Sequence, residues 1–207
     1  MLTRTIVILA NSIKHHNHCV AGKCLTTKEW IRPVANNDGA ELSDAQIKIE
    51  NPYGQFNVKP KQRVEIGLLQ KAPLPHQPEN FIVSDYRWQQ KYTIDNSELE
   101  QYLDTPTSLW GGGDHVPYFY IQNKLIEITQ SLYLVKVESL ELYKTPDNKR
   151  RASFNYQLNA YDLAVTDPNF DKIVANDKQT NGILCISLGE QFSGNCYKLV
   201  ATIFLEE

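Results

Sequence analysis

Short apolar runs that are rich in β-branched and aromatic residues constrain the fold of this chain more than any other feature of its sequence. Asn, Asp, Gly and Pro, which favour turns, lie between these runs. Residues 5–9 are continuously apolar, as in a strand covered on both faces, whereas residues 63–68 alternate apolar and polar, as in a half-buried strand. The pattern predicts a mainly β fold, with strands over 5–9, 19–25, 29–34, 63–68, 132–143, 152–163, 183–188 and 197–205.

The segments between these strands carry other signals. Residues 11–18 are polar and predict a loop, and the prolines within 72–85 remove amide donors, which predicts a connector. Residues 94–103 have a capping residue, early glutamates and apolar positions four apart, which together predict a short helix. A second brief helix is expected over 169–175, and the glycines within 105–115 predict a long loop.

This distribution suggests two compact β units joined by a connector. We expect a first OB-like unit over 1–72, a connector with a short helix and a Gly-rich loop over 73–115, and a second OB-like unit over 116–207. About five short strands in each unit fit small OB-type barrels better than a sandwich with evenly spaced turns.

Composition narrows the class of protein. The chain has 207 residues, 42% of them apolar, with neither a long apolar stretch nor a leader sequence after Met1, so we expect a soluble cytoplasmic protein with no membrane partner. Its four cysteines are then expected to be reduced thiols. A net charge of −3 gives no global field that attracts a polyanion, so any contact with nucleic acid must come from local patches.

The sequence resembles a known family in four stretches. These are residues 19–22, residues 30–34, residues 161–168, and residues 187–190 together with 196–201. They are similar to motifs of the prokaryotic dual-OB-containing domain family, and the resemblance spans nearly the whole chain. It implies two OB-like barrels and a nucleic-acid- or nucleotide-sensing role in bacterial conflict and defence systems. It implies no reaction and supplies no catalytic residues.

Aromatic rings beside fixed charges are the first candidate binding groups. Trp30 and Arg32 are two positions apart on an expected strand, so both side chains project from one face, where a stacked ring and a guanidinium could grip a nucleotide. Lys14 and Lys23 flank the same edge and could contact phosphates, and Tyr161 is expected to add a further stacking ring. The alternative is that Trp30 belongs to the core and Arg32 forms a salt bridge.

The loop Trp110-Gly111-Gly112-Gly113-Asp114-His115 combines flexible backbone, a ring, a carboxylate and an imidazole. Its glycine amides could approach a phosphate, although the loop lacks the Lys-Ser/Thr ending of a P-loop. His115 beside Asp114 could also act as an acid-base group in catalysis. The alternative is a turn whose Trp110 packs against the barrel.

Two sets of residues could hold a metal ion. His16, His18, Cys19 and Cys24 offer nitrogen and sulfur donors without zinc-finger spacing, and the alternative is a solvated loop with buried thiols. Asp162, Asp167 and Glu190 could bind magnesium if they converge.

Asp167 and the basic run 149–151 could also have a purely structural explanation. Asp167 precedes a proline, so we favour for it a backbone cap, while retaining it as a candidate ligand-binding residue. The run 149–151 is the densest basic patch and either contacts a nucleic-acid backbone or is merely solvated.

These groups support three hypotheses. The first is a non-catalytic module that binds single-stranded nucleic acid or a nucleotide and needs no cofactor. The second is a hydrolase or nuclease acting on nucleotides or RNA, with a divalent metal. The third is an accessory subunit that binds a partner protein of a defence system.

Overall fold

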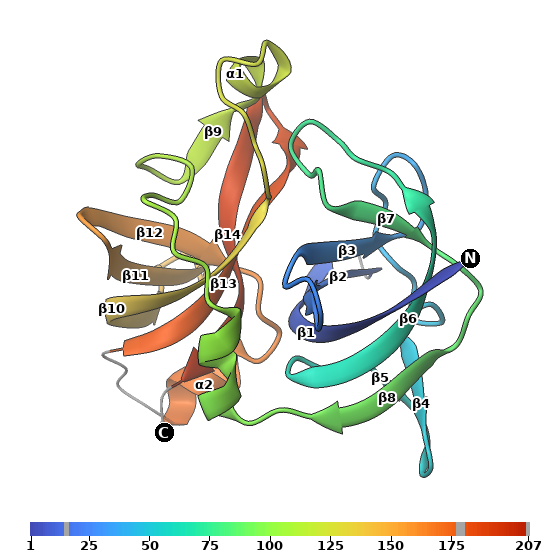
Figure 1. Ribbon diagram of the computed structural model, residues 1–207. Helices are drawn as coiled ribbons and strands as arrows, with labels where there is room; N and C mark the ends of the chain where they lie inside the picture. The colour runs from blue at the N-terminus through green and yellow to red at the C-terminus, as the bar shows by residue number, and fades with distance from the viewer. Residues whose placement is uncertain (15–16, 177–180, 206–207) are drawn as a thin grey trace. The chain divides into compact units, whose positions relative to one another are not determined.

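The structure is a computed structural model that describes residues 1–14, 17–176 and 181–205. The chain divides into two compact units, Met1–Tyr102 and Leu103–Glu207, called unit 1 and unit 2 below (Figure 1). Each unit is built almost entirely from antiparallel strands, with three short helical segments in the whole described chain. The predicted fold class, a mainly β chain of two OB-like barrels with short helices, is confirmed.

Unit 1 contains eight strands and one 3-10 helix. They are β1 (Leu2–Lys14), β2 (Asn17–Cys24), β3 (Trp30–Val34), β4 (Lys48–Asn51), β5 (Gly54–Asn57), β6 (Gln62–Lys71), β7 (Asn80–Val83), β8 (Trp88–Thr93) and η1 (Asn96–Tyr102).

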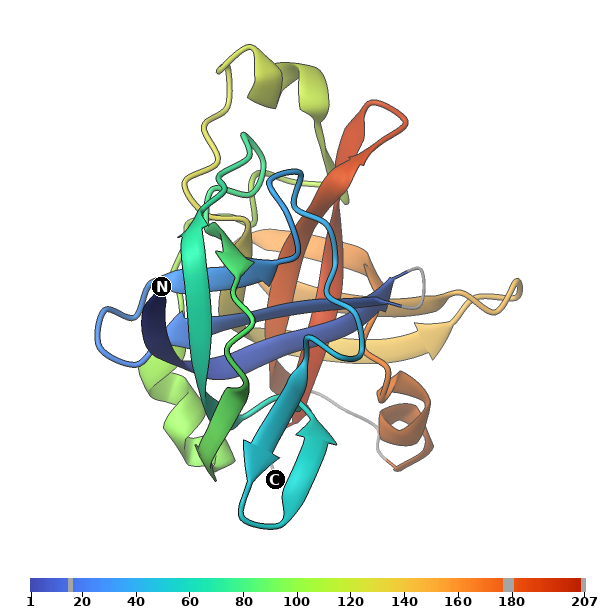
Figure 2. The same ribbon diagram turned by 90° about the vertical axis from the view of Figure 1, so that its right-hand side faces the viewer.

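Five of these strands close a barrel in the order β1-β2-β3-β7-β6-β1. The pair β3–β7 is parallel, with Arg32 opposite Asn80, and the antiparallel pair β1–β6 closes the barrel, with Ile6 opposite Val64. Their inward side chains form the core together with residues such as Leu42 and Trp88. Strands β8, β4 and β5 extend this sheet beyond β6, and the β4–β5 hairpin projects from the barrel (Figure 2).

Gly67 on β6 is a position where a side chain has no room. A Cβ atom there would lie 2.3 Å from Ser84 Oγ and 2.4 Å from Tyr86 Cβ, far inside van der Waals contact. The bare backbone allows the segment between β7 and β8 to pack against β6, where Ser84 N donates to Gly67 O at 3.0 Å. This contact fixes one wall of the pocket described below.

Unit 2 contains six strands and two helices. They are β9 (His115–Pro117), α1 (Tyr118–Gln122), β10 (Leu132–Lys144), β11 (Arg150–Tyr156), β12 (Asn159–Val165), α2 (Phe170–Asn176), β13 (Asn181–Phe192) and β14 (Asn195–Leu205).

The barrel of unit 2 closes in the order β10-β11-β12-β14-β13-β10. The pair β12–β14 is parallel, with Ala164 opposite Leu199, and strand β9 adds to the outer edge of β14. Numbered along the chain, both barrels therefore have the strand order 1-2-3-5-4-1 with a parallel 3–5 pair. A closed five-stranded Greek-key barrel of this kind is an OB fold.

Most of the predicted strands exist, but two interpretations of local sequence were wrong. Residues 11–14 and 17–18 extend β1 and β2 into a long hairpin instead of forming a loop, because Asn11 and His18 bond to neighbouring polar groups. The predicted strand 152–163 is two strands, since a turn at Gln157 (φ 53°) and Leu158 separates β11 from β12. Leu158 lies in this turn and is fully exposed.

The division of the chain also differs from the predicted one. The segment 73–115 carries β7 and β8, which pair with β6, so residues up to Tyr102 belong to unit 1. The helix expected over 94–103 is the 3-10 helix η1, and the one expected over 169–175 is α2. Among the described residues, no helix has the length and apolar character needed to cross a membrane.

Candidate functional site

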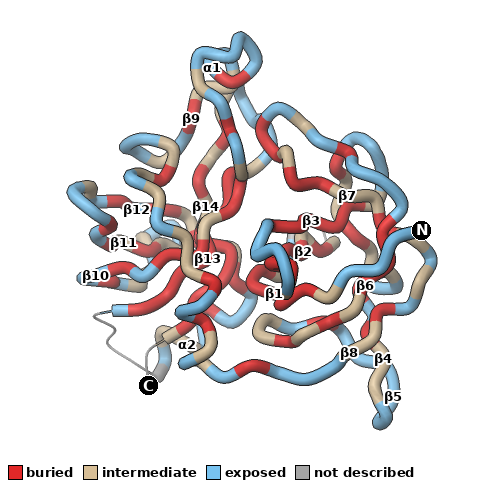
Figure 3. Tube along the Cα trace, viewed as in Figure 1, coloured by how far each residue is buried: buried red, intermediate tan, exposed pale blue. Residues whose placement is uncertain are grey.

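OB barrels bind ligands on the outer face of their second and third strands, which are β2 and β3 in unit 1. In unit 1 this face is buried, and β3 is buried along its whole length (Figure 3). Lys23 Nζ donates to the carbonyl oxygen of Tyr102 at 2.7 Å and lies 5.3 Å from the centre of the Trp30 ring. Arg32 Nε donates to Glu79 Oε1 at 3.2 Å. The outward groups of this face are therefore engaged within the chain.

Trp30 and Arg32 thus have the structural roles given above as the alternative: Trp30 is a core ring, and Arg32 forms a salt bridge. Trp30 is 5% exposed and Arg32 is 7% exposed, so neither presents the open ring or guanidinium that stacking on a nucleotide needs. Lys23 is 4% exposed, and the side chain of Lys14 lies outside the part of the chain that the structure describes.

In unit 2 the equivalent face, formed by β11 and β12, is open. The strand register places Tyr143 opposite Arg151, and Arg151 opposite Ala164, in one row across β10, β11 and β12. Asp162 on β12 links this row: Tyr143 Oη donates to its Oδ2 at 2.8 Å, and Arg151 Nε donates to its Oδ1 at 3.0 Å. The hydrogen bond to Asp162 raises the pKa of the Tyr143 hydroxyl.

The same face continues onto β14 and β9, because Tyr197 lies two residues before Leu199, the partner of Ala164. His115 is paired with Tyr197, and their ring centres are 5.6 Å apart. His115 Nδ1 lies 2.7 Å from Asp114 Oδ1, and both side chains are more than 40% exposed. This hydrogen bond lowers the pKa of Asp114, and the nearby positive charge of Arg151 lowers it further. The charge of Arg151 therefore links the two parts of this face electrostatically.

We call this surface the unit 2 face. It consists of Tyr143, Arg151 and Asp162 on β10–β12, Tyr197 on β14, and Asp114 and His115 at the start of β9. It combines three rings, one guanidinium and two carboxylates on an exposed sheet, the groups that bind bases and sugar-phosphate chains.

The glycine loop before β9 binds a cation of the chain itself. Lys198 Nζ donates to the carbonyl oxygens of Gly111, Gly112 and Gly113 at 2.8, 2.9 and 3.0 Å. Burial lowers the pKa of Lys198 to about 8, although Asp114 acts in the opposite direction. Because the three carbonyls point at the ammonium, the loop works here as an acceptor, not as the phosphate-binding set of amides that the sequence suggested.

Two rings from the predicted site support this loop. Trp110 Nε1 donates to Gln130 O at 2.9 Å, and the Trp110 ring lies 4.6 Å from that of Tyr133. Tyr161 is 2% exposed, and its hydroxyl donates to Gly111 O at 3.1 Å. Both contacts are structural, as in the alternative reading for Trp110, and Tyr161 has no open face for stacking.

Asp167 caps the chain where it turns toward α2. Its Oδ1 accepts from Asn169 N at 2.7 Å and its Oδ2 accepts from Ile203 N at 2.9 Å. Burial raises its pKa, while these amide bonds oppose that shift. With both oxygens occupied and the side chain buried, Asp167 acts as the backbone cap that the sequence favoured.

Each basic residue of the run 149–151 has an acidic neighbour. Lys149 Nζ lies 2.7 Å from Asp147 Oδ2, and Arg150 Nη2 lies 2.6 Å from Asp171 Oδ2. Arg151 pairs with Asp162, as described above. The patch is therefore largely neutralised within unit 2, and exposed pairs of this kind leave only a weak field for a phosphate.

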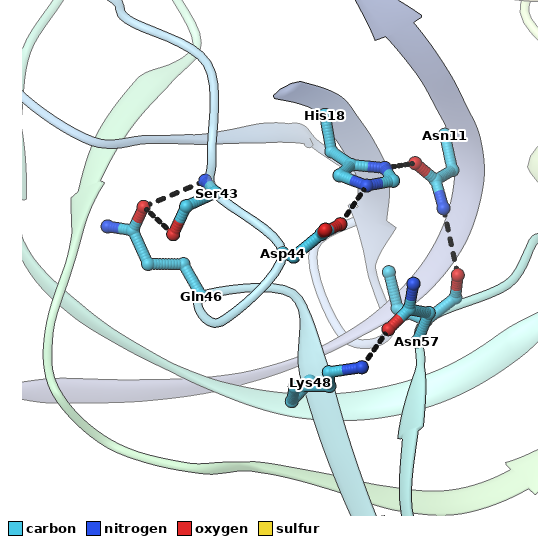
Figure 4. A network of polar contacts seen from close by, with 8 residues as sticks. Asn11, His18, Ser43, Asp44, Gln46, Lys48 and Asn57 are labelled. Carbon is cyan, nitrogen blue, oxygen red and sulfur yellow. Dashed lines mark hydrogen bonds and ion pairs between the residues drawn. The ribbon is translucent and has the colours of Figure 1, made fainter. Parts of the chain in front are cut away.

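The donors of the first predicted metal set do not form a cluster. His18 Nδ1 lies 3.0 Å from Asn11 Oδ1, and its Nε2 lies 2.8 Å from Asp44 Oδ1, so both ring nitrogens are occupied (Figure 4). Burial raises the pKa of the Cys24 thiol, but hydrogen bonds with Thr26 and Thr27 bring it to about 7.

His16 lies outside the described residues. Within the ranges that the structure describes, no three His, Cys, Asp or Glu side chains are placed to hold a metal, Asp162 and Asp167 of the second set included. The prediction that the chain needs no cofactor stays a prediction.

Comparison with known families fits this architecture. A model of the dual OB-containing domain matches residues 4–203. The chain belongs to this family. The resemblance seen in the sequence is thereby confirmed, and this dual OB domain spans both units of the chain.

Two other comparisons add nothing to the function. No curated protein matches this dual OB domain significantly. A solved structure described as the tetrameric p202 HIN2 aligns with 99% of the chain and 91% of its own length, at 8% identity and a TM-score of 0.36. A likeness at that score supports no conclusion about this dual OB domain.

The sequence did not identify Tyr143 and Tyr197 as site residues. The alternation over 132–143 is the signal for Tyr143, because it places that ring on the polar side of the strand. Tyr197 becomes part of the dual OB domain's open face only through the pairing of β14 with β9.

Proposed function

We propose that this dual OB domain binds single-stranded nucleic acid through the unit 2 face. The observation that supports the proposal is the contrast between the two barrels: the face used by OB folds is buried in unit 1 and open in unit 2. Single strands suit such a face because their unstacked bases can lie on aromatic rings.

Each group on the unit 2 face has a part in this binding. The rings of Tyr143, Tyr197 and His115 are stacking platforms for successive bases. Arg151, which Asp162 holds in place at 3.0 Å, contacts a phosphate, and Asp114 accepts hydrogen bonds from base amino groups.

The net charge of unit 2 adds little to the strength of this interaction. Residues 103–207 contain nine Lys and Arg against thirteen Asp and Glu, so unit 2 lacks a general attraction for a polyanion. We therefore expect modest affinity, dominated by stacking, with a shallow dependence on salt.

The test is the anisotropy of labelled oligonucleotides of about 15 nucleotides in about 50 mM salt. Tyr143→Ala should weaken binding by about 5- to 100-fold, the value of one stacked base, and Arg151→Gln should also reduce the salt dependence. Tyr53→Ala is the matched control, because that ring is 89% exposed on the hairpin of unit 1. Equal affinities for Tyr143→Ala, Tyr53→Ala and the unaltered protein would exclude the unit 2 face as the binding surface.

The exposed pair His115–Asp114 supports a second candidate, acid-base catalysis on a bound nucleotide or RNA. Incubation with RNA and nucleotides, with and without divalent metals, tests it. A product that His115→Ala fails to form would support an enzyme, whereas unchanged activity in that variant would remove this mechanism.

We include in the proposal a role in prokaryotic defence with a partner protein. Pull-down of the intact chain from its source cells tests for that partner, and recovery of the chain alone counts against it.

A further inference from the structure

A pocket of about 460 Å³ lies in unit 1, away from β2 and β3. The β4–β5 hairpin forms one side of it, and the segment 84–87 before β8 forms the other. Its volume falls within the range of about 300–1,000 Å³ that is usual for small-molecule sites. Every lining residue belongs to unit 1, so the pocket is independent of the unit 2 face.

The wall formed by residues 84–87 is held in place by β6. Gly67 leaves room for Ser84 and Tyr86 against that strand. Tyr86 Oη donates to Glu65 Oε1 at 2.5 Å, which raises the pKa of the tyrosine and fixes its side chain. Tyr86 therefore lines the pocket as a preorganised aromatic group, which binds a planar ligand without losing further side-chain entropy.

Two cationic side chains line the same pocket. Arg87 is exposed, and among the described residues no hydrogen bond or ion pair holds its guanidinium. Lys48 Nζ donates to Asn57 Oδ1 and retains further donors. A guanidinium with an unused donor fork and an ammonium lining the same pocket together suit a phosphate monoester.

Two carboxylates complete the polar lining. Glu50 Oε2 accepts from Gln89 Nε2 at 3.3 Å, and Asp85 lies on the wall beside Tyr86. Carboxylates repel a bare anion but accept hydrogen bonds from sugar hydroxyls and base amino groups. The lining thus requires a ligand that has an anionic end, a planar ring and hydrogen-bond donors.

We propose that this pocket binds a nucleoside 5′-monophosphate, either as the free nucleotide or as the 5′-phosphorylated end of a strand. Arg87 and Lys48 hold the phosphate, Tyr86 packs against the base, and Glu50 and Asp85 accept from the sugar and the base. The site is additional to the unit 2 face and does not depend on it.

The test is isothermal titration of the full chain with AMP, adenosine and inorganic phosphate, each to about 5 mM. AMP should bind at least about tenfold more tightly than either fragment, because only AMP engages the cations and the ring together. Arg87→Gln should weaken AMP by about tenfold or more, the usual value of a charge-assisted hydrogen bond. Arg4→Gln removes another exposed arginine of unit 1 and should leave AMP binding unchanged.

Any other pattern overturns the proposal. Absence of AMP binding, phosphate binding as tight as AMP binding, or equal AMP affinity in Arg87→Gln and Arg4→Gln would each do so. If a short 5′-phosphorylated oligonucleotide competes with AMP and its 5′-hydroxyl form does not, a strand end is a ligand of the pocket. If neither oligonucleotide competes with AMP, the ligand is the free nucleotide. Arg151→Gln keeps AMP binding intact in either case, which separates this site from the proposed unit 2 face.

Discussion

The ammonium of Lys198 lies 2.8 Å from the carbonyl oxygen of Gly111, and the next two glycine carbonyls complete a cage around it. The backbone amide of Lys198 also donates to Asp114 O at 2.8 Å. One residue of β14 therefore holds the loop that carries Asp114 and His115 to the unit 2 face.

Lys198→Met should release this loop while the barrel stays folded. Methionine fills a similar volume but donates no hydrogen bond, so the three glycine carbonyls turn to water. Hydrogen exchange should speed up in residues 111–115 by about tenfold or more, with no change in the strands of unit 2. Unchanged exchange in the loop would show that the cage does not order it.

Lys198 should also make stability depend on pH in a specific direction. Its pKa is about 8 in the folded chain, whereas an unfolded lysine titrates near 10.4, so between these values only the unfolded state keeps the proton. The free energy of unfolding then rises with pH across this window, by up to about 3 kcal/mol from this buried group. Urea denaturation at several pH values checks it: the difference between the unaltered protein and Lys198→Met should grow with pH, and a constant difference would contradict it.

Asp162→Asn should strengthen binding of single strands to the unit 2 face. The change removes a negative charge that holds Arg151 at 3.0 Å, which frees the guanidinium for phosphate. Exposed ion pairs contribute little, so we expect a gain of about twofold to fivefold in affinity. Anisotropy measures the gain, and spectrophotometric titration should show a lower pKa for Tyr143, because the bond to Asp162 now raises it. Weaker binding would mean that Asp162 itself contacts the ligand.

Trp30→Ala should act on folding instead of on ligand contact. The ring is 5% exposed beside Lys23, so its removal leaves a cavity and costs about 3–5 kcal/mol of unfolding free energy. Trp30→Phe should lose less. If Trp30→Ala unfolds like the unaltered protein but no longer binds nucleic acid, the original interpretation of Trp30 as a stacking residue is restored.

Gly67→Ala should destabilise unit 1 by about 1–3 kcal/mol, because the new methyl group overlaps with Tyr86. Gly112→Ala is the control: no atom lies within 4 Å of the added Cβ, and we expect a change within about 0.5 kcal/mol. Thermal denaturation compares the two variants. Equal stabilities would show that the segment 84–87 moves aside at little cost, so that this wall of the pocket is not rigid.

The strands that the sequence predicts best are those with one apolar face. The alternation over 63–68 identified β6 because its side chains meet the core on one side only. Strands β4 and β5 were missed, since each has four residues and β5 is exposed throughout. Strand β7 was missed because the prolines of 73–78 predict a connector, and the strand begins just after them.

The candidate site was predictable only in part. Asp114 and His115 were identified because they adjoin in sequence, and the structure adds Tyr197 and Arg151 to them through strand pairing and charge. Register between distant strands is not visible in one sequence, so the face that carries both Tyr143 and His115 could not be assembled from it. Trp30 and Tyr161 were overvalued because pattern alone does not distinguish a buried ring from an exposed one.

The link between the third and fourth barrel strands differs between the units: the β4–β5 hairpin occupies it in unit 1 and α2 occupies it in unit 2. Barrel closure involves neither insert, since the other strands pair among themselves. This position therefore accepts different inserted segments. Exchanging the insert would alter ligand choice without changing the strands of either barrel. The hairpin tip at Tyr53 is where a reporter group would be tolerated best.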